Sequence, residues 1–476
     1  MNVDEMLQRY PRAIEVDPSP IAERARQSHT VLVVLDDDPT GTQSVADLPV
    51  LARWEIEDFL WAFELDAPAV YVLTNSRSFD EATAERINRE VVTAAVAAAE
   101  QYGVRAAFTS RGDSTLRGHF PLEPNVIART LIELGAPQPD GVIVVPAFPD
   151  AGRVTIGGTH GMVADGIFTP VGETEYAQDS TFGYRSSRLA DWVDEKSDGR
   201  IAASSVVELT LDVVRAGADA VAAALLSAPV GSVFTADVVG EDDLRLLAMG
   251  LDQAESTGRT YIYRVGPPFV RARIGQAPRA PLPAANDAVE GATVGGLVVV
   301  GSHVGVTSRQ LADLTAHRPD AVVVEIDVPS ILSAHTAVAT IDAAVEAVSA
   351  AIMTTDVILH SSRTLIRTDD PQESLAISRA VSDALVAVVQ RTVKNARPRY
   401  VIAKGGITSS DIASRGLSIR RAMVRGSLFP GIVSVWEPAD GPAEGIPYVV
   451  FAGNVGTDST LTEAVAKLSL RAPQSV

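Results

Sequence analysis

The sequence predicts an α/β protein of two domains, each a mainly parallel sheet flanked by helices. Short apolar, β-branched runs alternate with longer Ala-rich segments of helical spacing along the whole chain. Continuous apolar runs of this kind are typical of strands that are buried on both faces of a parallel sheet. The 476 residues exceed what a single core usually holds. A composition of 46% hydrophobic and 21% charged residues is typical of a globular protein rather than a disordered one.

Nine apolar runs are predicted to be strands, and two long segments are predicted to be helices. The strands are Thr30–Leu35, Ala69–Leu73, Arg105–Thr109, Val142–Val145, Leu297–Val300, Ala321–Val324, Val357–Leu359, Tyr400–Ala403 and Tyr448–Phe451. The helices are Glu81–Gln101 and Gln372–Asn395, in which alanines and charges interleave. Pro371 suits the first turn of the second helix.

The segment Gly275–Gly291 is the best candidate for a domain boundary. It is rich in Pro, Ala and Gly and shows no periodicity, which is typical of an extended linker. We therefore expect an N-terminal domain at residues 1–275, a linker at 276–291 and a C-terminal domain at 292–476.

Charge and cysteine content exclude several classes of function. With 40 Lys and Arg against 60 Asp and Glu, the formal net charge is −20, so nucleic acid and anionic membranes are not expected partners. The chain has no cysteine, which excludes disulfides and thiolate chemistry. The sequence shows no apolar run long enough to span a membrane and no signal peptide at its start. The expectation is a cytoplasmic protein, and a homo-oligomer stays possible.

Polar residues follow the predicted strands of the N-terminal half at the points where a parallel sheet binds its ligands. Asp36, Asp37 and Asp38 follow the first strand, and the next two strand ends carry Arg77, Arg111, Asp113, Ser114 and Arg117. Arginine matches a carboxylate or a phosphate, while Asp, Asn, Ser and Thr can bind sugar-like hydroxyls. These residues predict a site for a polyhydroxylated acid. Solvated turns and helix caps are the structural alternative.

Glycines and hydroxyl side chains follow three predicted strands of the C-terminal half. These turns are Gly301–Ser308, Lys404–Asp411 and Gly453–Asp458. Each precedes a predicted helix, so backbone N–H groups could bind phosphate there. Neither a GxxxxGK[ST] loop nor a full GxGxxG motif occurs, so the site would not be of the Walker or dinucleotide type. The 7 histidines show no metal-binding spacing, and His160 could be structural or functional.

Several short motifs, in order along the chain, resemble those of the four-carbon acid sugar kinase family. They are Asp37–Gly41 (DDPTG), Thr74–Arg77 (TNSR), Asp113–Gly118 (DSTLRG), Gly301–Ser302 (GS), Lys404–Ser409 (KGGITS) and Gly453–Gly456 (GNVG). The chain has Arg111 where the family usually has lysine, Thr42 where an alanine often follows the glycine, and an extra Asp36. These departures leave the particular substrate open.

The resemblance implies an ATP-dependent kinase for a C4 sugar acid such as threonate, erythronate or 3-oxo-tetronate. It implies that the N-terminal domain binds the acid and the C-terminal domain binds ATP with Mg²⁺, with the active site in the cleft between them. By position, Asp37 or Asp38 would be the catalytic base, with Asp113 as third choice, and Arg77, Arg111, Asp113, Ser114 and Arg117 would bind the acid. The implied ATP-binding residues are Ser302, Gly405, Gly406, Ile407, Thr408 and Gly453.

Two other functions remain open from the sequence. The segment Asp36–Thr40 also fits the DxDx[TV] pattern of haloacid dehalogenase-like phosphatases, with Asp36 as nucleophile and Asp38 as acid and base. A sugar-acid-binding protein without catalysis would also have two α/β domains. A kinase needs ATP, a phosphatase releases phosphate without it, and a binding protein turns over nothing.

Overall fold

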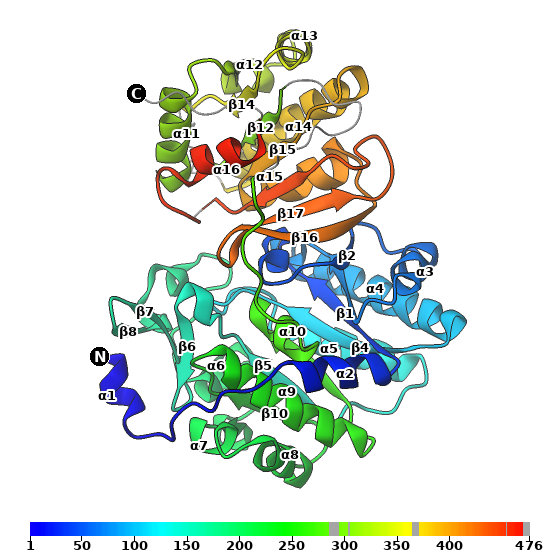
Figure 1. The fold of residues 1–476 in the computed structure, drawn as a ribbon, viewed down its shortest axis with the longest axis vertical. Coiled ribbons are helices and arrows are strands. Elements are labelled where there is room, and N and C mark those ends of the chain that lie inside the picture. Colours follow the sequence, from blue (N-terminus) through cyan, green and yellow to red (C-terminus); the bar gives the residue numbers. More distant parts are fainter. Residues whose placement is uncertain (285–294, 303–304, 364–370, 454, 470–476) are drawn as a thin grey trace. The chain divides into compact units, whose positions relative to one another are not determined.

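The computed structural model describes residues 1–284, 295–302, 305–363, 371–453 and 455–469. These residues form two compact units, Met1–Arg279 and Ala280–Val476, and each is described by itself. The elements are labelled in Figure 1.

The main sheet of the first unit has the strand order β2-β3-β1-β4-β11-β5-β10-β9, and all neighbouring strands are parallel. Their bounds are β1 Thr30–Asp36, β2 Leu48–Leu51, β3 Ala69–Leu73, β4 Arg105–Arg111, β5 Gly141–Val145, β9 Val207–Leu209, β10 Ser232–Ala236 and β11 Tyr261–Val265. A small antiparallel sheet contains β6 Arg153–Ile156, β7 Thr159–Ala164 and β8 Ile167–Pro170.

The helices of the first unit lie on both faces of the main sheet (Figure 1). They are α1 Val3–Leu7, α2 Ser19–Gln27, α3 Ile56–Glu64, α4 Glu81–Tyr102, α5 Leu122–Glu133, α6 Leu189–Lys196, α7 Leu211–Val214, α8 Ala218–Ser227, α9 Glu241–Ser256 and α10 Pro267–Arg273. Helices α3, α4 and α5 share one hydrophobic core with β1 and β3, in which Phe59, Val91 and Ile127 are buried. This core covers one face of the strands, and the residues of β1 and β3 that alternate with it are buried as well, apart from the half-buried Thr30. Burial on both faces explains why β1 and β3 are continuous apolar runs.

The sheet of the second unit has the order β13-β14-β12-β15-β18-β17-β16. The first five strands are parallel, and β17 and β16 extend the sheet as an antiparallel pair. Their bounds are β12 Leu297–Val300, β13 Val322–Ile326, β14 Val357–Ser361, β15 Val401–Lys404, β16 Arg421–Phe429, β17 Ile432–Pro438 and β18 Tyr448–Phe451. The helices are α11 Gly305–His317, α12 Val328–Leu332, α13 Ala337–Ala351, α14 Pro371–Asn395, α15 Gly406–Asp411 and α16 Thr460–Leu468.

The α/β fold class is confirmed, and so are the predicted strands and helices. The nine predicted runs are β1, β3, β4, β5, β12, β13, β14, β15 and β18, and the two predicted helices are α4 and α14. Pro371 is the first residue of α14. Among the described residues, none of the helices combines the length and apolar character needed to cross a membrane.

Part of the predicted linker is attached to the units by hydrogen bonds. The side-chain amide of Gln276 accepts from the N–H of Ala46 at 2.8 Å and donates to its carbonyl at 2.7 Å. The N–H of Leu282 donates to the carbonyl of Ser427 at 2.8 Å. Residues 285–291 of the predicted linker lie outside the described residues.

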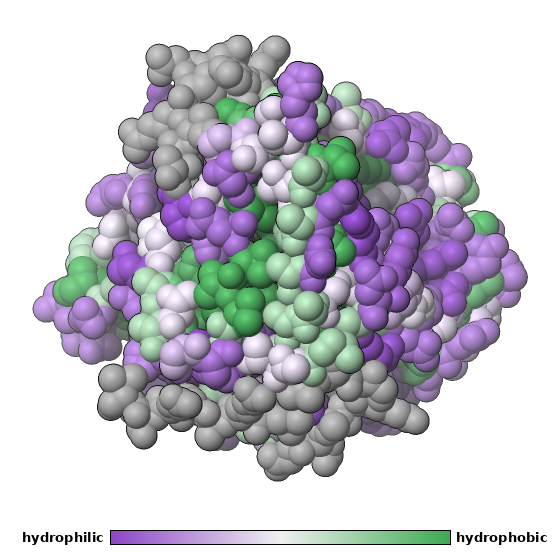
Figure 2. Space-filling view, turned by 90° about the horizontal axis from the view of Figure 1, so that it is seen from above, coloured by the Kyte–Doolittle hydropathy of each residue, from purple (hydrophilic) through white to green (hydrophobic). Residues whose placement is uncertain are grey.

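Apolar side chains gather in one area of the face drawn in Figure 2, where hydrophilic side chains border them. The exposed apolar residues of the second unit include Val322 and Val323 on the edge strand β13, and Val338 on α13. Exposed apolar area beside an unpaired strand edge is typical of a surface that associates. The homo-oligomer nevertheless stays a prediction.

Candidate functional site

The first part of the site is an ion-pair cluster at the carboxyl ends of β1 and β4. The register of these parallel neighbours pairs Asp36 with Arg111, the last residues of the two strands. The guanidinium of Arg111 contacts Asp36 through Nε and Nη2, and its Nη2 lies 3.1 Å from Oδ1 of Asp37. Asp36 and Asp37 are each 1% exposed and Arg111 is 2% exposed. Strand register therefore places Asp36 beside Arg111, and Asp37, the next residue, completes a buried pair of carboxyl groups around one guanidinium.

The turn after β1 packs against one side of the cluster. Asp38 begins the 3₁₀ helix Pro39–Ser44, and its Oδ1 accepts the N–H of Thr40 at 2.9 Å and the hydroxyl of Thr40 at 2.5 Å. Gly41 packs so closely over Asp36 and Arg111 that a Cβ there would collide with both side chains. The predicted Asp-Pro-Thr-Gly turn is thus present, and its glycine leaves room for the charges.

A partly open rim of charged side chains borders the cluster. Arg77 places Nη2 at 2.7 Å from Oδ2 of Asp38 and Nη1 at 3.6 Å from Oδ2 of Asp113. Arg117 donates from Nε to the same oxygen of Asp113 at 2.7 Å, and its guanidinium lies 5.0 Å from the centre of the Tyr176 ring. These rim side chains are 14% to 25% exposed, so a ligand can contact them directly.

Asp37 differs from its neighbours because neither of its carboxylate oxygens has a hydrogen bond among the described residues. Its Oδ2 faces the backbone of Gly118, where a Cβ would lie 3.1 Å from that oxygen. Burial raises the pKa of Asp37, and the nearby guanidinium groups of Arg77 and Arg111 counteract this only in part. Asp37 is therefore a buried carboxyl with unused hydrogen-bonding capacity and a raised pKa.

The other acids of the cluster have pKa values that move in different directions. Burial raises the pKa of Asp36 to about 8, despite the charge of Arg111. Burial also acts on Asp38, but Arg77 and Arg111 outweigh it and lower the pKa of Asp38. Arg77 and Arg117 likewise outweigh burial and lower the pKa of Asp113. Neighbouring carboxyls with separated pKa values are typical of sites that assign different roles to each acid.

A second buried network beneath the site was not predicted from the sequence. Arg264 on β11 donates to Oγ of Ser110 at 2.8 Å and pairs with Glu123 of α5 at 2.5 Å. Glu123 also accepts the hydroxyl of Ser110 at 2.8 Å and that of Ser76 at 2.5 Å. Gly112 and Gly118 pack against the guanidinium of Arg264. The feature of the sequence that could have indicated this network is Arg264, a lone arginine inside the apolar run Tyr261–Val265.

The loop that contains Ser114 is fixed from below by His160. Nε2 of His160 lies 2.8 Å from the carbonyl of Ser114, and Nδ1 lies 2.9 Å from Oγ1 of Thr155. A carbonyl only accepts, so Nε2 carries the proton and Nδ1 accepts the hydroxyl. Burial lowers the pKa of His160 to about 4. The geometry favours the structural alternative for His160, which orients the Asp113–Gly118 loop.

In the second unit, three turns meet at the carboxyl ends of the adjacent strands β12, β15 and β18. Gly405 has a φ of +122°, and a Cβ there would lie 3.1 Å from Cβ of Ser302 and from Oγ1 of Thr408. A Cβ on Gly453 would lie 3.0 Å from Oγ of Ser302. Only small residues permit this approach. His303, Val304 and Asn454, which belong to the predicted turns, lie outside the described residues.

The remaining predicted ATP-binding residues begin α15. Gly406 is the first residue of this six-residue helix, Thr408 is buried, and the side chain of Ile407 is 58% exposed. Ile407 is therefore an apolar side chain exposed next to the glycine turn.

Two cations lie at these turns, and neither forms an ion pair with a described residue. Lys404 donates from Nζ to the carbonyl of Ala452 at 2.6 Å, and Nζ lies 3.9 Å from the centre of the Phe451 ring. Burial lowers the pKa of Lys404 to about 7. Arg363 donates to the carbonyl of Ser302 at 2.8 Å and to Oγ of Ser308 at 2.5 Å, and burial lowers its pKa.

Arg363 was not predicted, although it closely follows the apolar run of β14. Its role becomes visible only when β14 is placed beside β12 in the sheet, because this brings Arg363 to Ser302.

Two models of known protein families match the chain, one in each of its two units. A model described as a sugar-binding N-terminal domain matches residues 32–273, and one described as a nucleotide-binding C-terminal domain matches residues 297–461. The chain belongs to the four-carbon acid sugar kinase family. The resemblance predicted from the motifs is confirmed. The carboxylate and arginine cluster lies in the sugar-binding domain of the family, and the glycine turns lie in its nucleotide-binding domain.

Two solved structures share the fold of this family member. One is a Salmonella typhimurium LT2 protein provisionally described as a tRNA synthase, with a TM-score of 0.65 and 18% identity over 91% of this chain and 98% of that chain. The other is a Haemophilus influenzae protein of a family of unknown function, DUF1537, with a TM-score of 0.60 and 18% identity over 92% of this chain and 100% of that chain. No curated protein matches the chain.

Proposed function

We propose that this protein is an ATP-dependent kinase that phosphorylates a hydroxyl of a C4 sugar acid such as threonate, erythronate or 3-oxo-tetronate. The observation that carries the proposal is Asp37, a buried carboxyl with a raised pKa and no hydrogen bond to any described residue, next to partly exposed arginines in a sugar-binding domain. The nucleotide-binding domain supplies the phosphate donor. Cytoplasmic location and meeting of the two ligands between the domains stay predictions.

The rim residues would bind the acid. Arg77 and Arg117 present guanidinium groups that match the planar carboxylate, and both are partly exposed. Asp38 and Asp113 are held in the ionised form by these arginines, so they would accept hydrogen bonds from substrate hydroxyls. Ser114 stays a proposed contact of the same loop.

We assign Arg111 a positioning role in place of the direct substrate contact predicted from the sequence. Its guanidinium is 2% exposed and is occupied by Asp36, Asp37 and the carbonyl of Asp38. It therefore holds the carboxyl groups in place, and Asp36 is its nearest partner.

Asp37 would act as the catalytic base. The substrate hydroxyl oxygen forms a bond to the γ-phosphorus while the bond to the leaving oxygen of ADP breaks, and the hydroxyl proton passes to Asp37. A raised pKa makes this carboxylate a better proton acceptor than Asp38, whose pKa is lowered. Phosphoryl transfer otherwise requires mainly positioning and neutralisation of charge.

The turns of the second unit fit a triphosphate. Gly405 and Gly453 allow phosphate oxygens to approach the backbone, and the hydroxyls of Ser302 and Thr408 border the same space. Lys404 and Arg363 supply positive charge, and neither is paired with an acid among the described residues. Ile407 offers an exposed apolar side chain for the adenine ring.

Mg²⁺ bound with ATP would neutralise the phosphate charge. In the part of the chain that the structure describes, no three His, Asp or Glu side chains form a cluster suited to a metal ion. We therefore expect the nucleotide phosphates and water to provide most of its ligands.

The geometry does not favour the phosphatase alternative. A nucleophilic Asp36 would need a carboxylate oxygen free to attack phosphorus, whereas Oδ1 of Asp36 is held by both Nε and Nη2 of Arg111. Asp37 is equally buried, but neither of its carboxylate oxygens has a hydrogen bond among the described residues.

The test is release of ADP from ATP, with Mg²⁺ present, against a panel of threonate, erythronate and 3-oxo-tetronate. We expect at least one acid to accelerate ADP release strongly, and the matched neutral polyols, threitol and erythritol, to be poor acceptors. If no acid accelerates ADP release while a phosphorylated acid loses phosphate without nucleotide, the kinase proposal fails and the phosphatase is correct.

A further inference from the structure

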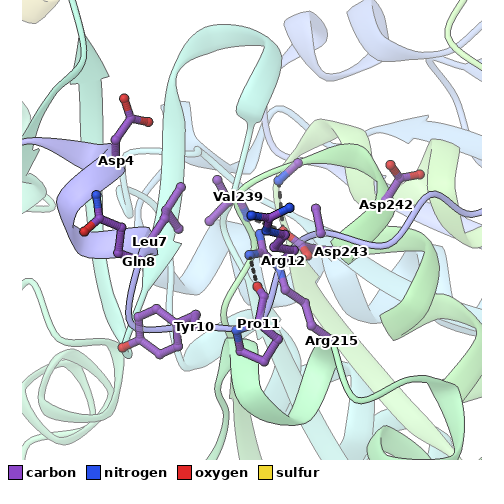
Figure 3. A pocket seen from close by; sticks show the side chains of 12 residues that line it. Asp4, Leu7, Gln8, Tyr10, Pro11, Arg12, Arg215, Val239, Asp242 and Asp243 are labelled. Carbon is purple, nitrogen blue, oxygen red and sulfur yellow. Dashed lines mark hydrogen bonds and ion pairs between the residues drawn. The ribbon is translucent and has the colours of Figure 1, made fainter.

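Two cavities of the first unit lie away from the candidate site, and their polar groups differ. The first, of about 590 Å³, lies between the N-terminal segment and the start of α9 (Figure 3). Its buried Arg215 is fully engaged, with bonds to Asp243 at 2.8 and 3.1 Å and to the carbonyl of Pro11 at 2.7 Å. The buried arginine of this cavity therefore needs no ligand to complete its hydrogen bonds.

The second cavity, of about 540 Å³, lies at the amino ends of β1, β4 and β11. Its apolar wall includes Phe108, Leu131, Pro139 and Ile262. This volume and this mostly apolar lining are typical of small-molecule sites. A four-carbon sugar acid is too small and too polar to fill such a space, so the cavity suits a different class of molecule.

The cavity is distinct from the candidate site because the two occupy opposite ends of the same strands. Arg105 begins β4 and lines the cavity, while Arg111 ends β4 and holds Asp36. The two arginines are six positions apart on an extended strand, which is roughly 20 Å.

The two acids that line the cavity, Asp252 and Glu255, are both neutralised by arginines. Asp252 pairs with Arg24 at 2.9 Å, and Glu255 pairs with Arg273. Arg259, which also lines the cavity, is itself paired with Asp140 at 2.5 Å. Neither lining acid is therefore left as an uncompensated counter-charge for a cation.

Two donors remain available after these pairs are formed. Arg105 is exposed, donates to the carbonyl of Ser28 at 3.1 Å and forms no ion pair with any described residue. Tyr261 is 5% exposed, and its buried Oη has no hydrogen-bond partner in the described chain. A buried hydroxyl without a partner is unfavourable, and a ligand acceptor would remove this cost.

We propose that this cavity is a second small-molecule site, which binds a carboxylate that carries an apolar ring or chain. The carboxylate pairs with Arg105 and accepts a hydrogen bond from Tyr261, and the apolar body lies against Phe108, Leu131 and Ile262. The site is independent of the sugar acid bound at the other end of the sheet.

The probes for this proposal are 2-naphthoate and the neutral 2-naphthylmethanol, titrated into the full chain by calorimetry. We expect 2-naphthoate to bind with one site per chain. Arg105→Ala should weaken it roughly tenfold, because a hydrogen bond to a charged group is worth about 1.5–3 kcal/mol. Tyr261→Phe, which removes a single oxygen, should weaken it roughly fivefold.

Arg86→Ala is the matched control, because Arg86 is an exposed arginine of α4 whose partner is Glu90 and which does not line the cavity. The Arg86→Ala variant should bind 2-naphthoate with the affinity of wild type. Arg105→Ala should bind the neutral 2-naphthylmethanol as wild type does. The proposal is overturned if 2-naphthoate does not bind, if both cavity variants bind it as wild type does, or if threonate displaces it. Circular dichroism establishes that each variant is folded.

Discussion

The two units prepare for negatively charged ligands in opposite ways. In the first unit every guanidinium of the site already faces a carboxylate: Arg111 faces Asp36 and Asp37, and Arg77 faces Asp38. In the second unit Lys404 and Arg363 face backbone carbonyls and a hydroxyl, and form no ion pair with a described residue. The first arrangement suits a ligand with one charge and several hydroxyls, and the second suits a ligand that brings several negative charges.

The pKa shifts follow the same contrast. Burial raises the pKa of Asp36 to about 8, which favours the neutral form in the acid-rich cluster. Burial lowers the pKa of Lys404 to about 7, which favours the neutral form of an amine that no acid of the described residues compensates. A bound phosphate would raise the pKa of Lys404 again. The difference teaches that net charge of the whole chain says little about the charge of each site.

The largest effect is expected for Asp37→Asn, which removes the proton acceptor with little change in shape. It should lower kcat by about 10²–10⁴-fold, the range for general-base catalysis, with ATP affinity unchanged. Asp38→Asn should mainly raise KM for the acid, since Asp38 has a lowered pKa and lies on the rim. Steady-state kinetics and calorimetric titration with ATP measure both. A larger loss of kcat in Asp38→Asn than in Asp37→Asn would reverse these roles.

Loss of the rim arginine Arg117 and loss of the buried arginine Arg111 should have different effects. Arg117→Ala should raise KM for the acid steeply, by the equivalent of about 2–5 kcal/mol, and Arg117→Lys should recover only part. Arg111→Ala should instead lower the free energy of unfolding by about 3–5 kcal/mol, because it leaves Asp36 and Asp37 buried without their counter-ion. Kinetics and denaturant unfolding separate the two outcomes. Equal KM for wild type and Arg117→Ala would show that Arg117 only pairs with Asp113.

In the second unit, Gly405→Val should weaken ATP binding by roughly ten- to a hundredfold. The valine side chain would fill the space of the turn, and a non-glycine residue at this positive φ adds strain of about 1–3 kcal/mol. Gly441→Val is the matched control. Gly441 also has a positive φ of +77°, but a Cβ there would meet only a carbonyl at 3.6 Å. Calorimetry should show normal ATP affinity in Gly441→Val. Normal affinity in a folded Gly405→Val protein would exclude this turn from the nucleotide site.

The smallest effect concerns Lys404 and stability against pH. Its folded-state pKa of about 7 lies below the ordinary value of 10.5, so between these values the unfolded chain binds more protons than the folded one. The contribution of Lys404 to the free energy of unfolding should therefore rise with pH across this window, by at most about 1.4 kcal/mol per pH unit. Lys404→Met should remove this slope in denaturant unfolding between pH 7 and pH 10. An unchanged slope would show that Lys404 stays charged in the folded protein.

Much of the fold could be predicted because β1, β3, β12 and β15 are buried on both faces and thus read as continuous apolar runs. The strands that were not predicted were β2, β6, β7, β8, β9, β10, β11, β16 and β17. Strand β16 shows why: its residues alternate between buried and less buried positions, and charges such as Arg425 interrupt the apolar pattern. Short strands such as β9 give too little pattern to detect.

The members of the site could be predicted better than their roles. Strand ends identified Asp36 to Asp38, Arg77 and Arg111, because parallel strands bring their carboxyl ends to one edge. That Arg111 lies under the carboxylates while Arg117 stays on the rim depends on burial, which spacing does not reveal. Arg264 and Arg363 were missed because their importance arises from strand order.

The most direct test of the central claim follows phosphorus by NMR in the full chain, with ATP, Mg²⁺ and the acid of the C4 panel that turns over fastest. The account predicts a new phosphate monoester resonance on the acid, formed in step with ADP, with no accumulation of inorganic phosphate. Asp37→Asn should bind ATP and form this resonance far more slowly. Inorganic phosphate as the product, or phosphate lost from the phosphorylated acid without any nucleotide, would contradict the account.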